Sequence, residues 1–209
     1  MIKYKNFYRK SSFKKDLRNG KIFLDLINEY KPKNFLEVGV LEGVTARNVC
    51  DLLYKFYGNN FRYVGIDLFG LDFEKNNIKE FTPISYNYSN PFKYFYHKFF
   101  IRKNPNTLDG VKYLLKKYEK SVNLYKGYSQ DLLNNMDLSL IDFCFLDGGH
   151  SYDTVKNDLL IILKRIKKNS LVLVDDYNQQ VYGVKKAVDE IKNKYQSQQI
   201  GRFMLIRKN

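Results

Sequence analysis

The stretch that decides the fold class is residues 34–67, NFLEVGVLEGVTARNVCDLLYKFYGNNFRYVGID. It opens with a short apolar run that ends at Gly39 and closes with a second one, Arg62 to Asp67. Between them, from Arg47 to Tyr57, apolar residues recur at helical spacing. Because strand, helix and strand follow one another, this segment predicts a βαβ unit with two parallel strands.

The rest of the chain continues this alternation. We expect further strands at 121–126, 140–147, 170–175 and 202–207, and helices at about 13–29, from about 107, at 152–168 and at 181–195. With right-handed crossovers, helices cover both faces of a mostly parallel sheet. The sequence therefore predicts one α/β domain over residues 1–209, with a doubly wound sheet of about seven strands.

One segment, residues 68–106, departs from the alternation. It is rich in Phe, Tyr, Asn and Lys, and it is too long for a simple loop in a compact domain. The aromatic residues between Phe92 and Phe100 indicate that it packs against something. The segment is either a surface insertion with its own small cluster or a lid that forms one wall of a substrate site.

The composition excludes several classes of protein. A hydrophobic fraction of 44 % in 209 residues is enough for a buried core, so a disordered tail, a linker and a fibrous protein are excluded. The net charge of +14 fits a basic face for nucleic acid, anionic lipid or an acidic substrate. However, Lys and Arg are spread along the chain, so we favour a solvated, Lys-rich surface.

The cysteines and the N-terminus bear on the cellular compartment. Cys50 and Cys144 lie far apart in apolar segments and match neither a metal-ligand spacing nor a disulfide framework, which favours a reducing compartment. No apolar run follows the basic residues 1–15, so we expect no signal peptide. No segment has enough consecutive apolar residues to span a bilayer. We therefore expect a soluble, cytoplasmic protein.

Acidic residues stand at or near the ends of several predicted strands. Asp67, Asp147 and the pair Asp175-Asp176 each end a strand, and Glu37 lies within the first one. In an open α/β sheet, ligands bind beyond the carboxyl ends of the strands. Buried acids without partners are costly, so several acids at one edge predict a polar ligand or a cation there.

The turn from Glu37 to Gly43 is a glycine-rich strand-to-helix connection. It lacks both the G-x-G-x-x-G spacing and the Lys-Ser/Thr of a phosphate-binding loop, so a phosphate cradle is disfavoured. Close approach of a ligand to the backbone is favoured, with Thr45 near the start of the next helix. Asp67 follows the second strand, where an acidic residue would hold two ribose hydroxyls.

Taken together, these motifs resemble those of a class I S-adenosylmethionine-dependent methyltransferase. The glycine turn 37–43, Asp67, Gly127-Tyr-Ser-Gln-Asp131 and Asp147-Gly-Gly-His150 occur in the family's order. The pair of motifs 146–152, LDGGHSY, and 174–178, VDDYN, is more specific. It resembles the metal-dependent small-molecule O-methyltransferases, in particular the macrocin-type sugar O-methyltransferases. This resemblance implies a Rossmann-like sheet whose last strand is antiparallel.

The resemblance also implies roles for individual residues. Gly39 would lie against the methionine part of S-adenosylmethionine, Asp67 would hold the ribose hydroxyls, and Ser129 and Gln130 would border the adenine. The full set of residues implied to bind the cofactor is Glu37, Gly39, Gly43, Thr45, Asp67, Leu68, Ser129, Gln130 and Asp147.

A divalent cation, expected to be Mg²⁺, is implied at Asp147, Asp175 and Asp176, with Asp147 also catalytic and His150 as the general base. The chemistry agrees, because a cation held by oxygen ligands lowers the pKa of a bound hydroxyl, and a neutral histidine can accept its proton. The chain departs from many relatives at Gly149, where they carry an acid, and at Asp176, where the catechol-type enzymes carry Asn.

The expected function is therefore O-methylation of a hydroxyl on a small molecule, favoured to be a sugar or glycan. Basic residues near 93–103 could attract an anionic acceptor. One alternative is a nucleic-acid methyltransferase, although no Asn-Pro-Pro-Tyr-type motif is present and we do not expect nucleic acid as the partner. Another alternative is a noncatalytic α/β binding protein whose acids hold a structural cation. The sequence leaves open whether the chain forms a homo-oligomer.

Overall fold

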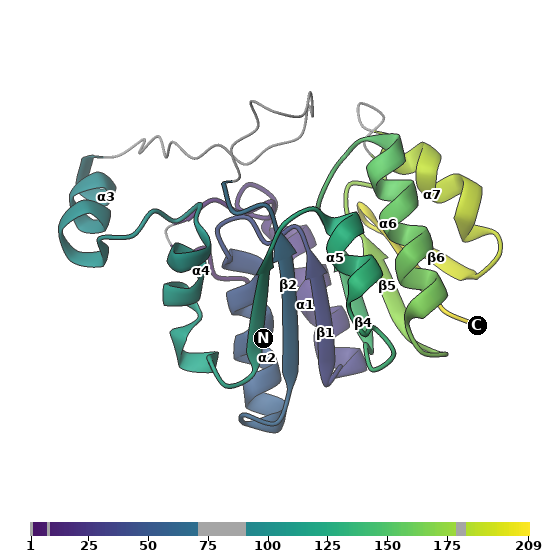
Figure 1. Cartoon of the computed structure of the whole chain (residues 1–209), viewed down its shortest axis with the longest axis horizontal. Helices are drawn as coiled ribbons and strands as arrows, with labels where there is room; N and C mark the ends of the chain where they lie inside the picture. Colours follow the sequence, from purple (N-terminus) through teal and green to yellow (C-terminus); the bar gives the residue numbers. More distant parts are fainter. Residues whose placement is uncertain (1, 8, 71–90, 179–182) are drawn as a thin grey trace.

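The computed structural model describes residues 2–7, 9–70, 91–178 and 183–209. Within these residues, seven strands form one sheet in the order β3-β2-β1-β4-β5-β7-β6 (Figure 1). The pairs among β1 to β5 are parallel, whereas β7 is antiparallel to both β5 and β6. The predicted doubly wound sheet with an antiparallel last strand is confirmed.

The strands are β1 (Asn34–Val38), β2 (Arg62–Asp67), β3 (Val122–Lys126), β4 (Phe143–Leu146), β5 (Leu171–Val174), β6 (Gln196–Ile200) and β7 (Phe203–Arg207). The helices are α1 (Leu17–Tyr30), α2 (Val44–Tyr57), α3 (Pro91–Phe95), η1 (Tyr96–Ile101), α4 (Leu108–Leu114), η2 (Lys116–Tyr118), α5 (Ser129–Asn135), α6 (Tyr152–Arg165) and α7 (Val184–Lys192).

The sheet separates two hydrophobic cores, because alternate residues of each strand point to opposite faces. In β1, Phe35 belongs to the core shared with α1 and α2, and Leu36 belongs to the core shared with α5, α6 and α7. Neighbouring strands continue both layers; Phe143, for example, stacks on Phe35 at 5.4 Å between ring centroids. The continuous apolar runs of the central strands reflect this burial on both sides.

Several element boundaries differ from those expected. Helix α1 begins at Leu17 rather than near residue 13, because the Asp16 side chain caps it by accepting from the Asn19 N–H at 3.1 Å. Helix α2 begins at Val44, three residues before the expected start, because Gly43 with φ +78° turns the chain directly into the helix. Strand β4 begins only at Phe143, since a turn precedes it, in which the Ile141 N–H donates to the Leu138 carbonyl at 3.1 Å.

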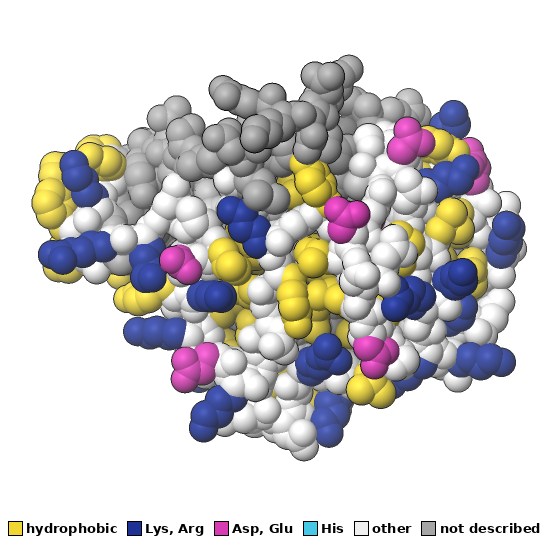
Figure 2. Space-filling model, viewed as in Figure 1, with side chains coloured by type: hydrophobic (Ala, Val, Ile, Leu, Met, Phe, Trp, Pro, Cys, Tyr) yellow, Lys and Arg dark blue, Asp and Glu magenta, His cyan; other side chains and the backbone are white. Residues whose placement is uncertain are grey.

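Two helical segments were not expected. One is α5, which starts inside the Gly127–Asp131 motif, and the other is the α3–η1 segment of the insertion. Figure 1 shows α3 well away from the sheet, and its end of the molecule carries hydrophobic and basic side chains in Figure 2. Phe92 and Phe100 are 82 % and 78 % exposed, so the aromatic side chains described there do not form a buried cluster. Much of the predicted insertion, residues 71–90, lies outside the described residues.

The chain runs outward from β1 to β2 and β3 and then crosses back to β4 on the other side of β1, so the direction of winding reverses between β1 and β4. Such a reversal leaves a crevice at the carboxyl ends of the central strands, where ligands of open α/β proteins bind. The ends of β1, β2, β4 and β5 meet at this edge. Within the described parts of the chain, none of the helices combines the length and the apolar character needed to cross a bilayer.

Candidate functional site

The glycine turn after β1 packs directly against the end of β4. Gly39 has φ +93°, and a Cβ atom placed on it would lie 2.0 Å from the carbonyl oxygen of Asp147. The turn is tied down by the Gly39 N–H, which donates to the Ile66 carbonyl at 2.9 Å, and by the Asp147 N–H, which donates to the Val38 carbonyl at 2.8 Å. Only glycine fits position 39, and the turn packs against the backbone of Asp147, the first residue of the acidic motif.

Asp67, at the end of β2, closes the other side of the turn. Its Oδ2 accepts from the Leu41 N–H at 2.8 Å and its Oδ1 from the Phe69 N–H at 2.7 Å. Burial raises the pKa of this carboxyl, while these backbone hydrogen bonds oppose the shift. The backbone N–H groups of Val40 and Leu68 add to these hydrogen bonds. Asp67 therefore holds the turn through backbone contacts, and its contact with ribose hydroxyls stays a prediction.

Glu37 lies beneath the turn and is fully buried. Its Oε2 accepts from the Tyr63 hydroxyl at 2.5 Å, and its Oε1 has no hydrogen-bond partner among the described residues. Burial raises its pKa to about 8, with the Tyr63 hydrogen bond opposing and Asp67 adding to the shift. At neutral pH the Glu37 side chain is therefore largely protonated.

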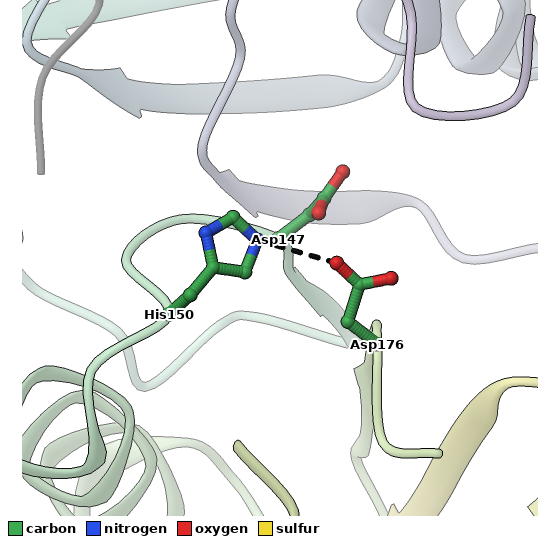
Figure 3. Close-up of side chains that lie close together, drawn as sticks. All are labelled: Asp147, His150 and Asp176. Carbon is green, nitrogen blue, oxygen red and sulfur yellow. Dashed lines mark ion pairs between the residues drawn. The ribbon is translucent and has the colours of Figure 1, made fainter. Parts of the chain in front are cut away.

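Beyond the ends of β4 and β5, three side chains form a compact cluster (Figure 3): Asp147, His150 and Asp176. Each offers one ligand atom within 4.8 Å of the others. His150 Nε2 lies 3.3 Å from Asp176 Oδ2. Two oxygens and an imidazole nitrogen at this spacing suit a divalent cation, or a histidine that exchanges a proton beside a carboxylate.

The turn that carries His150 is fixed from both sides. Ser151 caps α6 by accepting from the Thr154 N–H at 3.3 Å. The Gly183 N–H donates to the His150 carbonyl at 2.9 Å, and a Cβ on Gly183 would lie 2.2 Å from the Tyr152 nitrogen. The starts of α6 and α7 together therefore hold His150 next to Asp176.

Asp175, predicted as a third cation ligand, does not join this cluster. Its Oδ1 accepts from the Asp176 N–H at 2.7 Å, and its Oδ2 is bound by Arg202 Nη2. Arg202 Nη1 also lies 3.6 Å from Asp176 Oδ1. The physical reason for the difference is that the β6–β7 hairpin brings a guanidinium to Asp175, so this carboxylate already has a cationic partner.

The electrostatics reflect three carboxylates near one another in a partly buried site. Burial raises the pKa of Asp147 well above its usual range, and the charges of Asp175 and Asp176 add to the shift. Burial also raises the pKa of Asp175, to about 6, although the Arg202 guanidinium opposes the increase. The site thus disfavours an accumulation of negative charge unless a cation compensates it.

The remaining predicted cofactor residues lie around the same edge. Gly43 is the N-cap of α2, and the Thr45 hydroxyl is hydrogen-bonded to the Tyr4 hydroxyl at 2.8 Å. Ser129 and Gln130 are half-buried in the first turn of α5. Leu68, directly after β2, is also half-buried. Thr45 thus faces the N-terminal segment, whereas Leu68, Ser129 and Gln130 keep partly exposed positions.

The sequence analysis did not identify two residues that contact the acidic side chains of the site, Ser12 and Arg202. The Ser12 side chain hydrogen-bonds Asp147. The Arg202 guanidinium packs over the Phe13 ring with 4.9 Å to its centroid. Neither residue belongs to a motif, so local sequence carries no signal for Ser12. The only signal for Arg202 is a basic residue at the start of the last expected strand, residues 202–207.

The residues present fit the two groups that the resemblance implied. Asp147 and Asp176, with His150 beside them, supply the hard ligands and the spacing that a divalent cation needs. The glycine turn lies at the switch point of the sheet, and Asp67 is hydrogen-bonded to it, where the resemblance implied the cofactor.

Comparison with known families agrees with this arrangement. The sequence profile of a family described as a methyltransferase domain matches residues 36–177, from the glycine turn through the second acidic motif. The chain belongs to this methyltransferase family. The match spans the site from Glu37 to Asp176 and leaves α1 and the β6–β7 hairpin outside. A search of curated protein sequences found no match.

Solved structures show the same methyltransferase fold. The O-methyltransferase NovP superposes with a TM-score of 0.62 at 18 % identity, over 92 % of this chain and 78 % of NovP. CalS11, a TDP-rhamnose 3'-O-methyltransferase of calicheamicin biosynthesis, gives 0.60 at 16 %, over 93 % and 81 %. An O-methyltransferase from Bacillus cereus in complex with SAH gives 0.60 at 13 %, over 95 % and 84 %. The predicted class of enzyme, a methyltransferase with a Rossmann-like fold, is confirmed.

Proposed function

We propose that this methyltransferase transfers the methyl group of S-adenosylmethionine to a hydroxyl of a small molecule, with the help of a divalent cation. The observation that carries the proposal is the cluster of Asp147, His150 and Asp176 at the switch point, next to the glycine turn. A methyltransferase that acts on an alcohol must lower the pKa of the hydroxyl and remove its proton. The cluster contains the residue types for both tasks.

In this proposal Asp147 and Asp176 hold the cation and His150 is the general base. When bound, the cation would lower the pKa of the acceptor hydroxyl, and S-adenosylmethionine would supply the methyl group. His150 Nε2 accepts the hydroxyl proton, and Asp176 Oδ2, 3.3 Å away, stabilises the resulting imidazolium. The glycine turn, Asp67 and the start of α5 bind and orient the cofactor, since alignment dominates a methyl transfer.

The proposed acceptor is a sugar or glycan hydroxyl. The support is the LDGGH motif with His150, and the fold shared with CalS11, which is itself a sugar methyltransferase. Lys98, Arg102 and Lys103, beside the aromatic segment, suit an acceptor that carries phosphate. We also propose that the reaction takes place in the cytoplasm, as two free, buried cysteines suit a reducing compartment.

A screen of donor and acceptors by mass spectrometry tests the function. We expect methylated product with sugar or nucleotide-sugar hydroxyls, and loss of product on addition of a chelator. Asp147→Asn should abolish the metal-stimulated rate. Undiminished activity in the presence of chelator would refute the role of the cation, and a reaction limited to phenolic acceptors would refute the sugar assignment. Absence of any S-adenosylhomocysteine binding by calorimetry would instead favour a noncatalytic binding protein.

A further inference from the structure

Arg202 is a cation built into the acidic site. It stands in the turn between β6 and β7, and its side chain is only 12 % exposed. One guanidinium nitrogen, Nη2, binds Asp175 Oδ2, and the other, Nη1, lies 3.6 Å from Asp176 Oδ1. A guanidinium keeps its charge at all physiological pH values, so Arg202 remains a cation beside these carboxylates.

The position of Arg202 is enforced by its surroundings. The guanidinium packs over the Phe13 ring at 4.9 Å and the Phe203 ring at 5.8 Å from the centroids. The Tyr177 N–H donates to the Arg202 carbonyl at 2.9 Å, which joins the hairpin to the segment directly after Asp176. A planar guanidinium can stack on rings and bind two carboxylates at once, which an ammonium group cannot do equally well.

This contact decides which carboxylates a divalent cation can use. Both oxygens of Asp175 are engaged, one by Arg202 and the other by the Asp176 N–H. A cation that takes Asp175 as a ligand must therefore compete with the Arg202 guanidinium for this carboxylate. Arg202 also places a like charge close to the cation, and divalent-cation affinity depends on the number and charge of the oxygen ligands.

We propose that Arg202 is a resident counter-cation that competes with the divalent cation for Asp175 and Asp176. It limits the cation's carboxylate ligands to Asp147 and Asp176 and keeps the affinity low, while it compensates the acidic cluster when no cation is bound. The inference rests on the proposed function, because it concerns the same cation. It assigns Arg202 as a positioning residue that acts through Asp175 and Asp176.

The test measures Mn²⁺ binding to the full chain by electron paramagnetic resonance. Arg202→Gln should lower the dissociation constant of Mn²⁺ by about tenfold or more, because Asp175 becomes a ligand. Arg207→Gln is the matched control, since it removes the same charge from the other end of β7, where the guanidinium lies over Tyr30. We expect this control to change the constant by less than about twofold.

A double-mutant cycle locates the effect at Asp175. Asp175→Asn alone should change the Mn²⁺ dissociation constant by less than about threefold, whereas in the Arg202→Gln background it should cancel most of the gain. Arg202→Lys keeps the charge but loses the planar guanidinium, so its Mn²⁺ dissociation constant should lie between those of the original chain and Arg202→Gln. This variant replaces Arg202→Gln in the test if the latter does not fold. A merely structural ion pair would alter the melting temperature and leave all these constants equal.

Three outcomes would overturn the inference: equal Mn²⁺ affinity in Arg202→Gln and Arg207→Gln, an Asp175→Asn variant that loses Mn²⁺ as completely as Asp147→Asn, or no Mn²⁺ binding by any variant. Only the last also refutes the cation in the proposed function. If the Arg202→Gln variant binds Mn²⁺ and the original chain does not, competition by Arg202 is supported in its strongest form. If the original chain transfers no methyl group but the Mn²⁺ dissociation constants are as expected, the proposed reaction is refuted and the role of Arg202 is not.

Discussion

At the scale of single residues, His150 has two chemical roles to choose between, because its Nε2 faces Asp176 at 3.3 Å and lies within reach of a cation held by Asp147. A base needs Nε2 to be available for a proton, whereas a ligand uses the same lone pair for the cation. The two roles exclude each other in one step and affect different measurements.

We predict that His150→Gln lowers kcat by roughly 10²- to 10⁴-fold, as expected for loss of a general base, and removes the rise in rate with pH in the range where histidine titrates. The Mn²⁺ dissociation constant should stay within about threefold of the original value, because carboxylates dominate the affinity. Ser151→Ala is the control, as it removes the neighbouring N-cap and should cost only about 1 kcal/mol of stability. Strongly weakened Mn²⁺ binding in His150→Gln would show that the histidine is a ligand instead.

Glu37 leads to a prediction about pH and stability. Its pKa is about 8 in the folded chain, compared with 4.5 for the ordinary side chain. Above about pH 4.5 the unfolded chain releases this proton and the folded chain retains it. The stabilising contribution of the group is therefore complete below about pH 4.5 and is lost as pH rises through 8.

Glu37→Gln removes this titration and keeps an acceptor for the Tyr63 hydroxyl. We predict that its melting temperature exceeds that of the original chain by an amount that grows from pH 5 to 8 and then levels off, reaching several degrees. Thermal unfolding in matched buffers measures the difference, in which the titration of the other acids cancels. A difference independent of pH would mean that Glu37 is ionised in the folded protein.

At the scale of elements, the turn between β1 and α2 is set by backbone contact. A Cβ on Gly39 would meet the Asp147 carbonyl at 2.0 Å, and the same position requires φ +93°. Gly58, which ends α2 with φ +60°, has no heavy atom within 4 Å of its added Cβ. The two glycines thus share a positive φ and differ in packing.

We predict that Gly39→Ala abolishes S-adenosylhomocysteine binding and destabilises the fold by more than about 2 kcal/mol, because the turn must separate from β4. Gly58→Ala should cost about 1 kcal/mol from backbone strain and leave binding unchanged. Calorimetry and thermal unfolding of the pair measure both effects. Equal loss of stability in the two variants would show that the positive φ alone sets the cost of the substitution, and that the close approach of Gly39 to Asp147 adds nothing.

The α3–η1 segment has exposed aromatic rings, with Phe95 and Phe99 stacked at 5.7 Å and each 55 % exposed. If this segment forms a wall of the acceptor site, the double variant Phe95→Ala/Phe99→Ala should raise the acceptor KM several-fold without changing the melting temperature. Leu140→Ala, at a 54 % exposed position after α5, is the matched control. An unchanged KM would leave the segment as a surface insertion.

At the scale of the whole molecule, the charge of +14 is distributed over the surface, as Figure 2 shows for one face, where acidic residues stand among the basic ones. We predict weak binding of duplex DNA or RNA, with a shallow dependence on salt between about 50 and 200 mM, since few phosphates would be contacted at once. Fluorescence anisotropy measures the slope. A steep slope, equivalent to roughly six or more phosphate contacts, would favour a nucleic-acid substrate.

Most of the sheet could be predicted from local patterns. The apolar runs located β1, β2, β3, β5 and β7 to within one residue at either end, since strands buried on both faces need continuous apolar sequence. Caps displaced the helix boundaries, and α5 was missed because it begins inside the Gly127–Asp131 motif, which was interpreted as a cofactor-binding turn. The candidate site was predicted as a set of strand-end acids, and Asp147 and Asp176 do meet there with His150.

The sequence by itself determined the α/β class, the alternation of strands and helices over most of the chain, the glycine turn and the edge of the sheet that carries the acids. These features follow from periodicity and from residues adjacent in sequence. Only the tertiary structure decided that Arg202, 27 residues after Asp175, binds that carboxylate, and that Ser12 reaches Asp147. The physical reason is that a buried charge takes its partner from whichever element packs against it, and that packing depends on the whole fold.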